Sequence, residues 1–168
     1  MFTVTANTRP ARPEDANAIS QVHAQSWRQA YTGILPYKAL MKMINRRDAK
    51  WWARAIRKST IVMVAEMDGE IAGYVTLGPN RVSTFPFEGE IYELYLKPEF
   101  QGIGLGAMLF AQARKELKRR AYKGVTVWVL QDNESAVGFY QNAGGRPIAR
   151  GSEHFDDTKL EKIAIAWD

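Results

Sequence analysis

Cysteine is absent from the 168 residues, and histidine is scarce. The absence of cysteine excludes disulfides, thiolate nucleophiles and thiolate metal ligands. The two histidines, His23 and His154, are too few and too far apart in sequence to indicate a metal centre, so we expect no metal. No apolar run approaches the roughly 18 residues of a membrane span, and the N-terminal segment lacks the apolar core of a signal peptide. The sequence therefore predicts a cytoplasmic protein with no membrane partner.

The composition is otherwise that of an ordinary globular protein, with 46% hydrophobic and 24% charged residues. A chain of this length is typical of one domain, so we expect residues 1–168 to form a single domain. The net charge of +5 suggests nucleic-acid binding, because Lys and Arg contacts to phosphate dominate such binding. The densest basic cluster, Arg114 to Lys123, falls on the polar face of a predicted helix. We therefore favour a solvated helix face and no nucleic-acid partner.

One stretch, from Glu90 to Ala121, combines a strand, a glycine loop and a helix. The strand is predicted over Ile91 to Leu96, which is rich in β-branched, aromatic and aliphatic residues and is closed by Pro98. From about Gly104 the pattern becomes helical, with an apolar stripe formed by Leu105, Met108, Leu109, Leu117 and Ala121. The first N–H groups of a helix have no partner within it, and glycines let a phosphate approach them closely. The stretch therefore predicts an anion-binding site.

Spacing decides among three nucleotide-binding interpretations of the loop, which consists of Gln101, Gly102, Ile103, Gly104, Leu105 and Gly106. A P-loop requires Gly-Lys-Ser/Thr at its end, and no such sequence follows Gly106. A dinucleotide fingerprint matches two of the glycines and Ala107, but its first glycine must directly follow the strand, and Lys97 to Gln101 intervene. The pattern that fits is Q-x-x-G-x-G after a strand. It resembles the pyrophosphate-binding motif of the GNAT superfamily of acyl-CoA N-acyltransferases.

A second motif supports this resemblance. Val125 to Leu130 is a continuous apolar run, typical of a strand buried on both faces. A short helix is then predicted, with a cap, an apolar face and a glycine stop at Asp132 or Asn133, Ala136, Phe139, Tyr140 and Gly144. This N-x-x-A-x-x-F-Y-x-x-x-G pattern is similar to the second GNAT motif and lies at the expected distance from the first. The resemblance covers the chain in outline and is specific from about Glu90 to Gly144.

The other segments complete the expected fold. Strands are predicted over Phe2 to Asn7, Ile61 to Glu66, Glu70 to Leu77, Ile148 to Gly151 and Leu160 to Trp167, with a polar loop through His154 and Asp157. Helices are predicted from Asp15, a candidate cap, to a break at Gly33 and Pro36, then over Lys38 to Met43 and Asp48 to Arg57. The resemblance implies a mixed α/β fold: a twisted, mostly antiparallel central sheet of six or seven strands, with helices on both faces.

One position departs from the family pattern. Where the family usually has an aromatic residue after Gly144, this chain has Gly145. The turn into the next strand is therefore expected to lose an apolar anchor. We expect local looseness around Arg146 and Pro147.

The resemblance also implies where acetyl-CoA binds. The two central strands would splay apart at one end, and pantetheine would enter the split and bond to main-chain groups of the first strand. The glycine loop would cradle the pyrophosphate, and residues of the second motif would complete the site. Besides the loop Gln101 to Gly106, the implied cofactor residues are Leu94, Tyr95, Leu96, Asn133, Ala136 and Tyr140.

The implied reaction needs a base. A primary amine with a pKa of about 10.4 is mostly charged near neutral pH, so its proton must be removed before it attacks a thioester. Glu93 lies in the central strand, where desolvation should raise its pKa toward useful values, although structural pairing is an equal alternative. Trp128 stands where some family members carry a carboxylate, which leaves Glu93 as the best candidate and Glu90 as the second. Tyr140, beside the thioester, could donate a proton to the departing thiolate or could only pack.

The acceptor would arrive from the side of Trp27, Tyr31 and Phe85. Trp27 and Tyr31 are one helical turn apart, and either core packing or a pocket wall explains them. Phe85, in a long aromatic loop, could line the acceptor site or pack back.

We therefore expect an acetyl-CoA-dependent N-acetyltransferase acting on a primary amine of a small molecule or a protein. The alternative is a noncatalytic acyl-CoA-binding sensor on the same scaffold. An exposed edge strand over Leu160 to Trp167 would make a homodimer possible.

Overall fold

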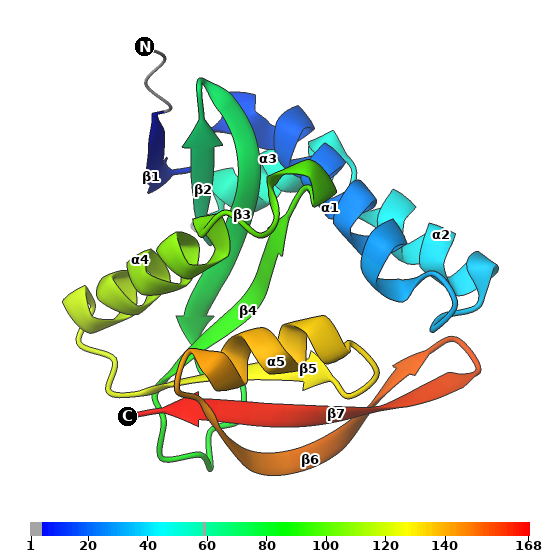
Figure 1. The fold of residues 1–168 in the computed structure, drawn as a ribbon, viewed down its shortest axis with the longest axis vertical. Coiled ribbons are helices and arrows are strands. Elements are labelled where there is room, and N and C mark those ends of the chain that lie inside the picture. The colour runs from blue at the N-terminus through cyan, green and yellow to red at the C-terminus, as the bar shows by residue number, and fades with distance from the viewer. Residues whose placement is uncertain (1–4, 59) are drawn as a thin grey trace.

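The structure of the protein is a computed structural model that describes residues 5–58 and 60–168. Its centre is one seven-stranded sheet with the strand order β1-β2-β3-β4-β5-β7-β6. Neighbouring strands are antiparallel except for β4 and β5, which are parallel. The strands are β1 (Ala6–Pro10), β2 (Ile61–Met67), β3 (Glu70–Pro79), β4 (Gly89–Leu96), β5 (Val125–Leu130), β6 (Arg146–Phe155) and β7 (Thr158–Trp167). The helices are α1 (Ala16–Tyr31), α2 (Tyr37–Arg46), α3 (Ala49–Arg57), α4 (Leu105–Arg119) and α5 (Glu134–Asn142) (Figure 1).

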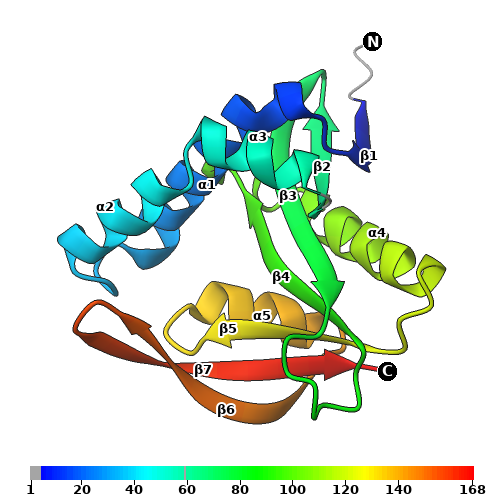
Figure 2. The ribbon, with the colours of Figure 1, turned by 180° about the vertical axis from the view of Figure 1, so that it is seen from behind.

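The sheet is covered on both faces, which confirms the predicted mixed α/β fold. Along β2, Met63 and Ala65 face the cluster that contains α4, whereas Val62 and Val64 face the cluster that contains α1 and α3. This alternation follows from the two-residue period of a strand and explains why the middle of β2 is apolar throughout. Figure 2 shows the same arrangement from behind, with α3 and α4 on either side of β2 and β3.

The two strands predicted over Ile61 to Glu66 and Glu70 to Leu77 are confirmed, and they pair as the antiparallel hairpin of β2 and β3. Asp68 and Gly69 form its turn with φ angles of 52° and 82°. Positive φ at both central residues matches the right-handed twist of the flanking strands, and Asp-Gly tolerates it. The turn sequence therefore sets the pairing next to the turn, and a bulge between Ala65 and Glu66 shifts the register of the rest of the hairpin.

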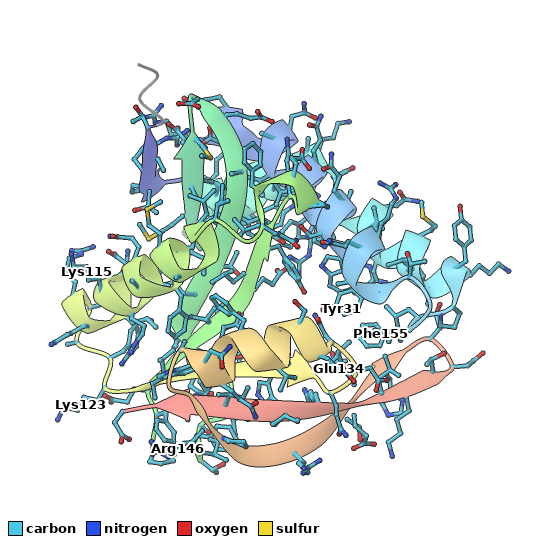
Figure 3. All side chains as sticks on the ribbon, viewed as in Figure 1. Tyr31, Lys115, Lys123, Glu134, Arg146 and Phe155 are labelled. Carbon is cyan, nitrogen blue, oxygen red and sulfur yellow. The ribbon has the colours of Figure 1, made fainter. Side chains whose placement is uncertain are left out.

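A third apolar cluster joins α1 and α2 to the hairpin of β6 and β7. Trp27 and Tyr31 of α1 are buried there with Leu40 of α2 and Phe155 at the hairpin end. Tyr31 and Phe155 approach each other from opposite elements in Figure 3. The hairpin tip is also tied to α2 by an ion pair between Lys42 Nζ and Asp156 Oδ1 at 3.1 Å. These contacts join the end of the hairpin of β6 and β7 to α1 and α2.

The N-terminal segment differs from the prediction. Its strand begins at Ala6 and continues through Pro10, while Phe2 to Val4 of the expected strand lie outside the described residues. Asp15 immediately precedes α1, but its side chain does not cap that helix. Its carboxylate instead accepts hydrogen bonds from Arg9, at 2.7 and 3.0 Å, and from the backbone N–H of Arg12, at 2.7 Å. The cap prediction was wrong because a charged partner from β1 competes for the carboxylate.

The C-terminal segment also differs. The expected polar loop through His154 is strand, because β6 continues to Phe155 and pairs with β7 as far as Thr158. The second strand of this hairpin, β7, lies between β5 and β6 and is not an edge. The edges are β1 and β6, so the predicted edge strand at Leu160 to Trp167 was wrong. Strand order depends on where the chain returns, which local patterning does not encode.

Gly145 does not leave a loose turn. A Cβ at this position would lie 2.4 Å from Ile165 and 2.5 Å from the ring of Trp167, so the space for an aromatic residue is already filled. The Trp167 indole N–H also donates to the carbonyl of Ala143 at 3.1 Å. Arg146 begins β6 directly after the glycine. Trp167 thus supplies from β7 the apolar anchor that was expected to be missing.

Helix α4 buries one stripe and solvates the other, as its pattern predicts. The buried stripe consists of Leu105, Gly106, Leu109, Phe110, Ala113 and Leu117. Ala121, expected on this stripe, lies beyond the helix and is exposed, with a φ of 66°. Lys115 projects from the outer side of α4 (Figure 3). In the described part of the chain, no helix has the length and apolar character that crossing a membrane would require.

Candidate active site

The site begins where β4 and β5 separate. These strands pair only at Gly89, Glu90 and Ile91, opposite Val125, Thr126 and Val127. On its other side β4 pairs with β3, where Leu77 faces Ile91 and Thr76 faces Glu93, so Tyr92 is an extra residue. Such a bulge bends its strand and increases the local twist. The rest of β4 therefore diverges from β5, as the sequence resemblance implied.

One cavity, of 640 Å³, lies between the open end of β4, the glycine loop and α5. Most of the residues expected to bind the cofactor meet here, namely Leu94, Tyr95, Leu96, Gln101, Gly102, Gly104, Gly106, Asn133, Ala136 and Tyr140. Two expected residues do not line it. Ile103 points outward with 55% of its surface exposed, and Leu105 is buried in the core. Ser26 and Gln29 of α1 line this cavity as well and were not predicted.

The glycine loop has the geometry of an anion cradle. Gly102 and Gly104 adopt φ angles of 79° and 92°, a region that side chains with a Cβ rarely enter. A Cβ on either would meet nothing within 4 Å, so both glycines border open space. Met108 donates the first helical hydrogen bond to the Gly104 carbonyl at 3.1 Å, which leaves the preceding N–H groups without helical partners. The donor set and the space fit a phosphate group.

Some backbone groups of β4 already form hydrogen bonds with other residues of the protein. The Lys97 N–H donates to Ala72 on β3, so the alternating groups of Leu94 and Leu96 point toward the split. The Leu96 carbonyl already accepts from the Ser26 hydroxyl at 2.8 Å and from the Gln101 side-chain amide at 3.2 Å. Leu94 is thus the position whose backbone is best placed for an extended ligand.

Tyr140 lies on the wall shared by this cavity and a second one. Its ring packs between Phe110, Phe139 and Trp167, with ring centroids 5.0 to 5.9 Å away. Burial raises the pKa of the Tyr140 phenol. The hydroxyl therefore stays protonated near neutral pH and is available as a donor.

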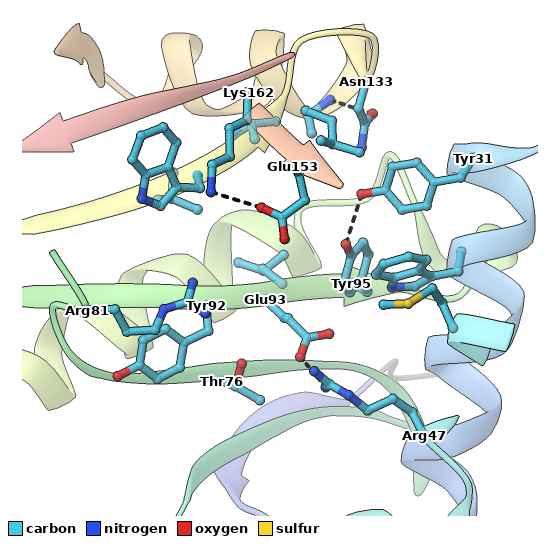
Figure 4. Close-up of a pocket in the computed structure, with 18 of the residues that line it drawn as sticks. Tyr31, Arg47, Thr76, Arg81, Tyr92, Glu93, Tyr95, Asn133, Glu153 and Lys162 are labelled. Carbon is cyan, nitrogen blue, oxygen red and sulfur yellow. Dashed lines mark hydrogen bonds and ion pairs between the residues drawn. The ribbon is translucent and has the colours of Figure 1, made fainter. Parts of the chain in front are cut away.

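The second cavity, of 720 Å³, lies on the side of α1, α2 and α3 (Figure 4). Trp27 and Tyr31 line this cavity and also belong to the third apolar cluster. Each residue therefore both packs in the core and forms part of the cavity wall. Phe85 does not line this cavity. Its ring stacks on the ring of Trp128, with 6.1 Å between the ring centroids, and Trp128 lines the cavity instead. The Tyr31 and Tyr95 hydroxyls are 3.0 Å apart across this cavity.

Glu93 faces the second cavity and is held by two partners. One oxygen pairs with the Arg47 guanidinium, and the other accepts from the Tyr74 hydroxyl at 3.0 Å. Burial raises the pKa of Tyr74 well above its ordinary value, and the Glu93 charge adds to this effect, so Tyr74 remains a donor. Glu93 is therefore a positioned carboxylate at the cavity wall.

Glu90, the second candidate base, is placed elsewhere. It is fully buried and does not line either cavity. Its carboxylate accepts from the guanidinium and the backbone N–H of Arg81, with the Nη2 distance 2.6 Å. Glu90 thus anchors the loop after β3 and has no access to an acceptor amine.

Arg47, Tyr74 and Thr76 were missed by the sequence reasoning. Arg47 lies between α2 and α3, 46 residues before its partner Glu93, so no local spacing connects them. Thr76 faces Glu93 directly across β3 and β4, but the bulge at Tyr92 shifts the register there, so counting along the strands would not have paired them. Its hydroxyl is buried without a hydrogen-bond partner among the described residues.

Metal ligation has no candidate in residues 5–58 and 60–168, where no group of three or more His, Asp or Glu side chains could hold an ion. Four charged groups of the second cavity are paired with one another, Arg47 with Glu93 and Glu153 with Lys162, whereas Arg81 pairs with Glu90 outside the cavity. Glu153 and Lys162 form an ion pair at 2.9 Å on the side of β6 and β7. The arrangement suits binding and proton transfer by side chains.

Comparisons with known proteins agree with this geometry. The model of the acetyltransferase (GNAT) family matches residues 24–144. An uncharacterised N-acetyltransferase of Archaeoglobus fulgidus is 35% identical over 147 residues, 86% of this chain and 96% of its own length. The uncharacterised N-acetyltransferase YuaI of Bacillus subtilis is 28% identical over 160 residues, 95% of this chain and 91% of its own.

Solved structures share the fold. The crystal structure of PaiA N-acetyltransferase from Thermoplasma acidophilum in complex with coenzyme A superposes with a TM-score of 0.76 at 21% identity. The match covers 95% of this chain and 98% of that one.

Proposed function

The chain belongs to the GNAT family of acetyltransferases, and we propose that it transfers the acetyl group of acetyl-CoA directly to a primary amine of a small molecule or a protein. One observation carries this proposal: the cavity beside the glycine loop and the cavity beside α2 and α3 meet at the split between β4 and β5. They share Leu94, Tyr95, Asn133, Ala136 and Tyr140 as walls. A donor and an acceptor bound in the two cavities would react at this junction.

The first cavity suits the donor. The N-terminus of α4 and the open space beside Gly102 and Gly104 would receive the pyrophosphate. The free backbone edge at Leu94 would hold the pantetheine arm in an extended conformation. The thioester would then lie beside Tyr140, one of the residues that line both cavities.

The second cavity suits the amine. In our proposal Glu93 takes a proton from the incoming ammonium group, and the neutral nitrogen attacks the carbonyl carbon. A C–N bond forms and the C–S bond breaks, while Tyr140 donates a proton to the departing thiolate. The remaining extra proton on nitrogen restores the phenol through water. Arg47 and Tyr74 act as positioning residues, because they hold the Glu93 carboxylate.

The test is a thiol-release assay with acetyl-CoA and a panel of primary amines. We expect release of free CoA only when both are present, with an acetylated amine seen by mass spectrometry. A melting shift with acetyl-CoA, without thiol release for any amine in the panel, would instead support a noncatalytic acyl-CoA sensor.

A further inference from the structure

The second cavity, proposed above to hold the amine, is called the acceptor cavity from here on. It is lined by three cationic side chains, each of which lies against an aromatic ring. Arg47 lies 4.1 Å from the ring centre of Trp51, Arg81 4.7 Å from that of Tyr92, and Lys162 4.5 Å from that of Trp128. Stacking on a ring fixes the direction of a long side chain and reduces the entropy it loses when it binds a ligand. Figure 4 shows Arg81 and Lys162 away from Tyr31 and Asn133, toward the other end of the cavity.

Arg81 is the most firmly oriented of the three. The fully buried Glu90 accepts from its Nε at 3.2 Å and from its Nη2 at 2.6 Å. The supporting ring is fixed too, because the Tyr92 hydroxyl donates to the Pro79 carbonyl at 2.6 Å. Yet 63% of the Arg81 side chain is exposed, and its Nη1 makes no hydrogen bond to any other described residue. A preoriented guanidinium with free donors is suited to an oxyanion.

The helices that wall the same cavity are strongly basic. Residues 37–58 contain eight lysines and arginines and one acidic residue, Asp48. This excess is larger than the net charge of +5 of the whole chain. Met43, Arg47, Trp51 and Trp52 of this stretch line the cavity. A concentration of positive charge beside a cavity attracts anions and raises their rate of entry.

The two carboxylates that line the acceptor cavity, Glu93 and Glu153, have different partners. Glu153 is paired with Lys162 at 2.9 Å, which neutralises both. Glu93 sits with Arg47 near the junction with the donor cavity, where the amine is expected. Opposite charges are thus available at separate positions: a carboxylate at the reacting end and the free edge of Arg81 away from it.

We propose that the acceptor is a small primary amine that also carries an oxyanion, a carboxylate or a phosphate, and that Arg81 binds this oxyanion. The proposal rests on the function proposed above and narrows its substrate class. It disfavours polyamines, whose second cationic group would meet Arg81 and the basic helices.

The experiment compares kcat/KM for amines of matched length in the thiol-release assay. The panel is 1-aminobutane, 4-aminobutanoate, 3-aminopropyl phosphate and 1,4-diaminobutane, with chains of three and six carbons as a length series. We expect at least one oxyanion amine to exceed 1-aminobutane by about tenfold or more, the size expected for a charge-assisted hydrogen bond. Comparing 4-aminobutanoate with 3-aminopropyl phosphate identifies whether the preferred oxyanion is a carboxylate or a phosphate. A preference for 1,4-diaminobutane, or equal rates for all amines, overturns the inference while leaving the proposed function intact.

Variants then assign the effect to Arg81. Arg81→Gln should raise KM for the preferred oxyanion amine about tenfold more than it raises KM for 1-aminobutane. Because this change leaves Glu90 buried without its partner, the double variant Arg81→Gln/Glu90→Gln is measured in parallel, and an acetyl-CoA melting shift verifies its fold. Lys115→Gln on the outer side of α4 is the matched control for lost charge. An oxyanion preference that survives in the double variant overturns the role of Arg81. Absence of turnover with every amine would contradict the proposed function instead.

Discussion

At the scale of single residues, Tyr140 is the side chain that joins the two cavities. Burial raises its pKa, so the phenol is a proton donor throughout the neutral range. Tyr140→Phe keeps the packing against Phe110, Phe139 and Trp167 and removes only the hydroxyl. We expect kcat to fall by about ten- to a thousandfold with an unchanged acetyl-CoA dissociation constant. Near-normal turnover in Tyr140→Phe would mean that the ring only packs against the cofactor; Tyr140→Ala would then damage both affinity and stability.

In the proposed mechanism Glu93 has the opposite role, that of proton acceptor. Glu93→Gln keeps the shape and can still accept from Tyr74 and Arg47, but it cannot take up a proton. A cost of about a hundredfold or more near neutral pH is expected for lost general-base catalysis. The acidic limb of the pH–rate profile should also move toward the pKa of the amine itself. An acidic limb that stays in place would show that the proton leaves through water and that Glu93 is structural.

His23 affects stability and takes no part in the proposed chemistry. It is buried beside Trp27 and Trp52, its Nδ1 has no hydrogen-bond partner among the described residues, and burial, with the Arg47 charge adding, lowers its pKa to about 3. In the unfolded chain the pKa of His23 is about 6.5. As the pH falls, the unfolded chain therefore takes up this proton at a higher pH than the folded chain does. The stability that the neutral form contributes is therefore fully present above about pH 6.5 and is lost as the pH falls toward 3.

This linkage predicts a slope of up to about 1.4 kcal/mol of unfolding free energy per pH unit between roughly pH 6 and 4. Urea denaturation of the protein and of His23→Gln at pH 7 and pH 5 measures it. The variant should be less stable at pH 7 and should lose less stability between the two values. Equal losses in both proteins would place the acid sensitivity elsewhere.

At the scale of elements, we propose that the loop before α4 binds the pyrophosphate of acetyl-CoA through its backbone N–H groups. With acetyl-CoA at about one hundred times its dissociation constant, the fold should gain roughly 2.7 kcal/mol. Gly104→Val should abolish most of the resulting melting shift, because the side chain would fill the open space beside the loop. Differential scanning fluorimetry with and without acetyl-CoA measures the shift.

Gly33→Val is a matched control for the strain of that substitution. Gly33 has a φ of 87°, close to the 92° of Gly104, and a Cβ at this position would likewise meet nothing within 4 Å. It lines neither cavity. The control should lower the melting temperature while keeping the ligand-induced shift. A full shift in Gly104→Val would place the cofactor at another site.

At the scale of the whole molecule, one wall of the acceptor cavity forms where the hairpin of β6 and β7 reaches α1 and α2. Phe155 lines the cavity and lies 6.5 Å from Trp27 between ring centroids. Phe155→Leu should raise KM for the amine several-fold by loosening this wall, with the acetyl-CoA melting shift unchanged. Steady-state kinetics with the best amine of the panel measure the effect. Leu160→Ala, in the same cluster but lining neither cavity, is the control, and an equal rise in KM there would indicate general loosening.

The sequence by itself determined the elements whose requirements are local. Gly102 and Gly104 are needed where φ is positive before a helix, Asn133 caps α5 by accepting from Ala136 N–H at 3.3 Å, and Asp68-Gly69 closes a hairpin. Each depends on residues a few positions apart, so spacing alone predicts it. The mixed α/β fold and most of the donor cavity follow from these local signals and the family resemblance they reveal.

Only the tertiary structure decided which distant side chains meet. It paired Glu93 with Arg47, assigned Glu90 to Arg81, placed Phe85 behind Trp128 and inserted β7 between β5 and β6. A carboxylate in a strand has the same local sequence whether it faces a cavity or a buried arginine. Its partner is selected when separate elements pack and desolvate it, because an unpaired buried charge is costly. The acceptor cavity is built from such long-range contacts, and local spacing therefore could not predict its charges.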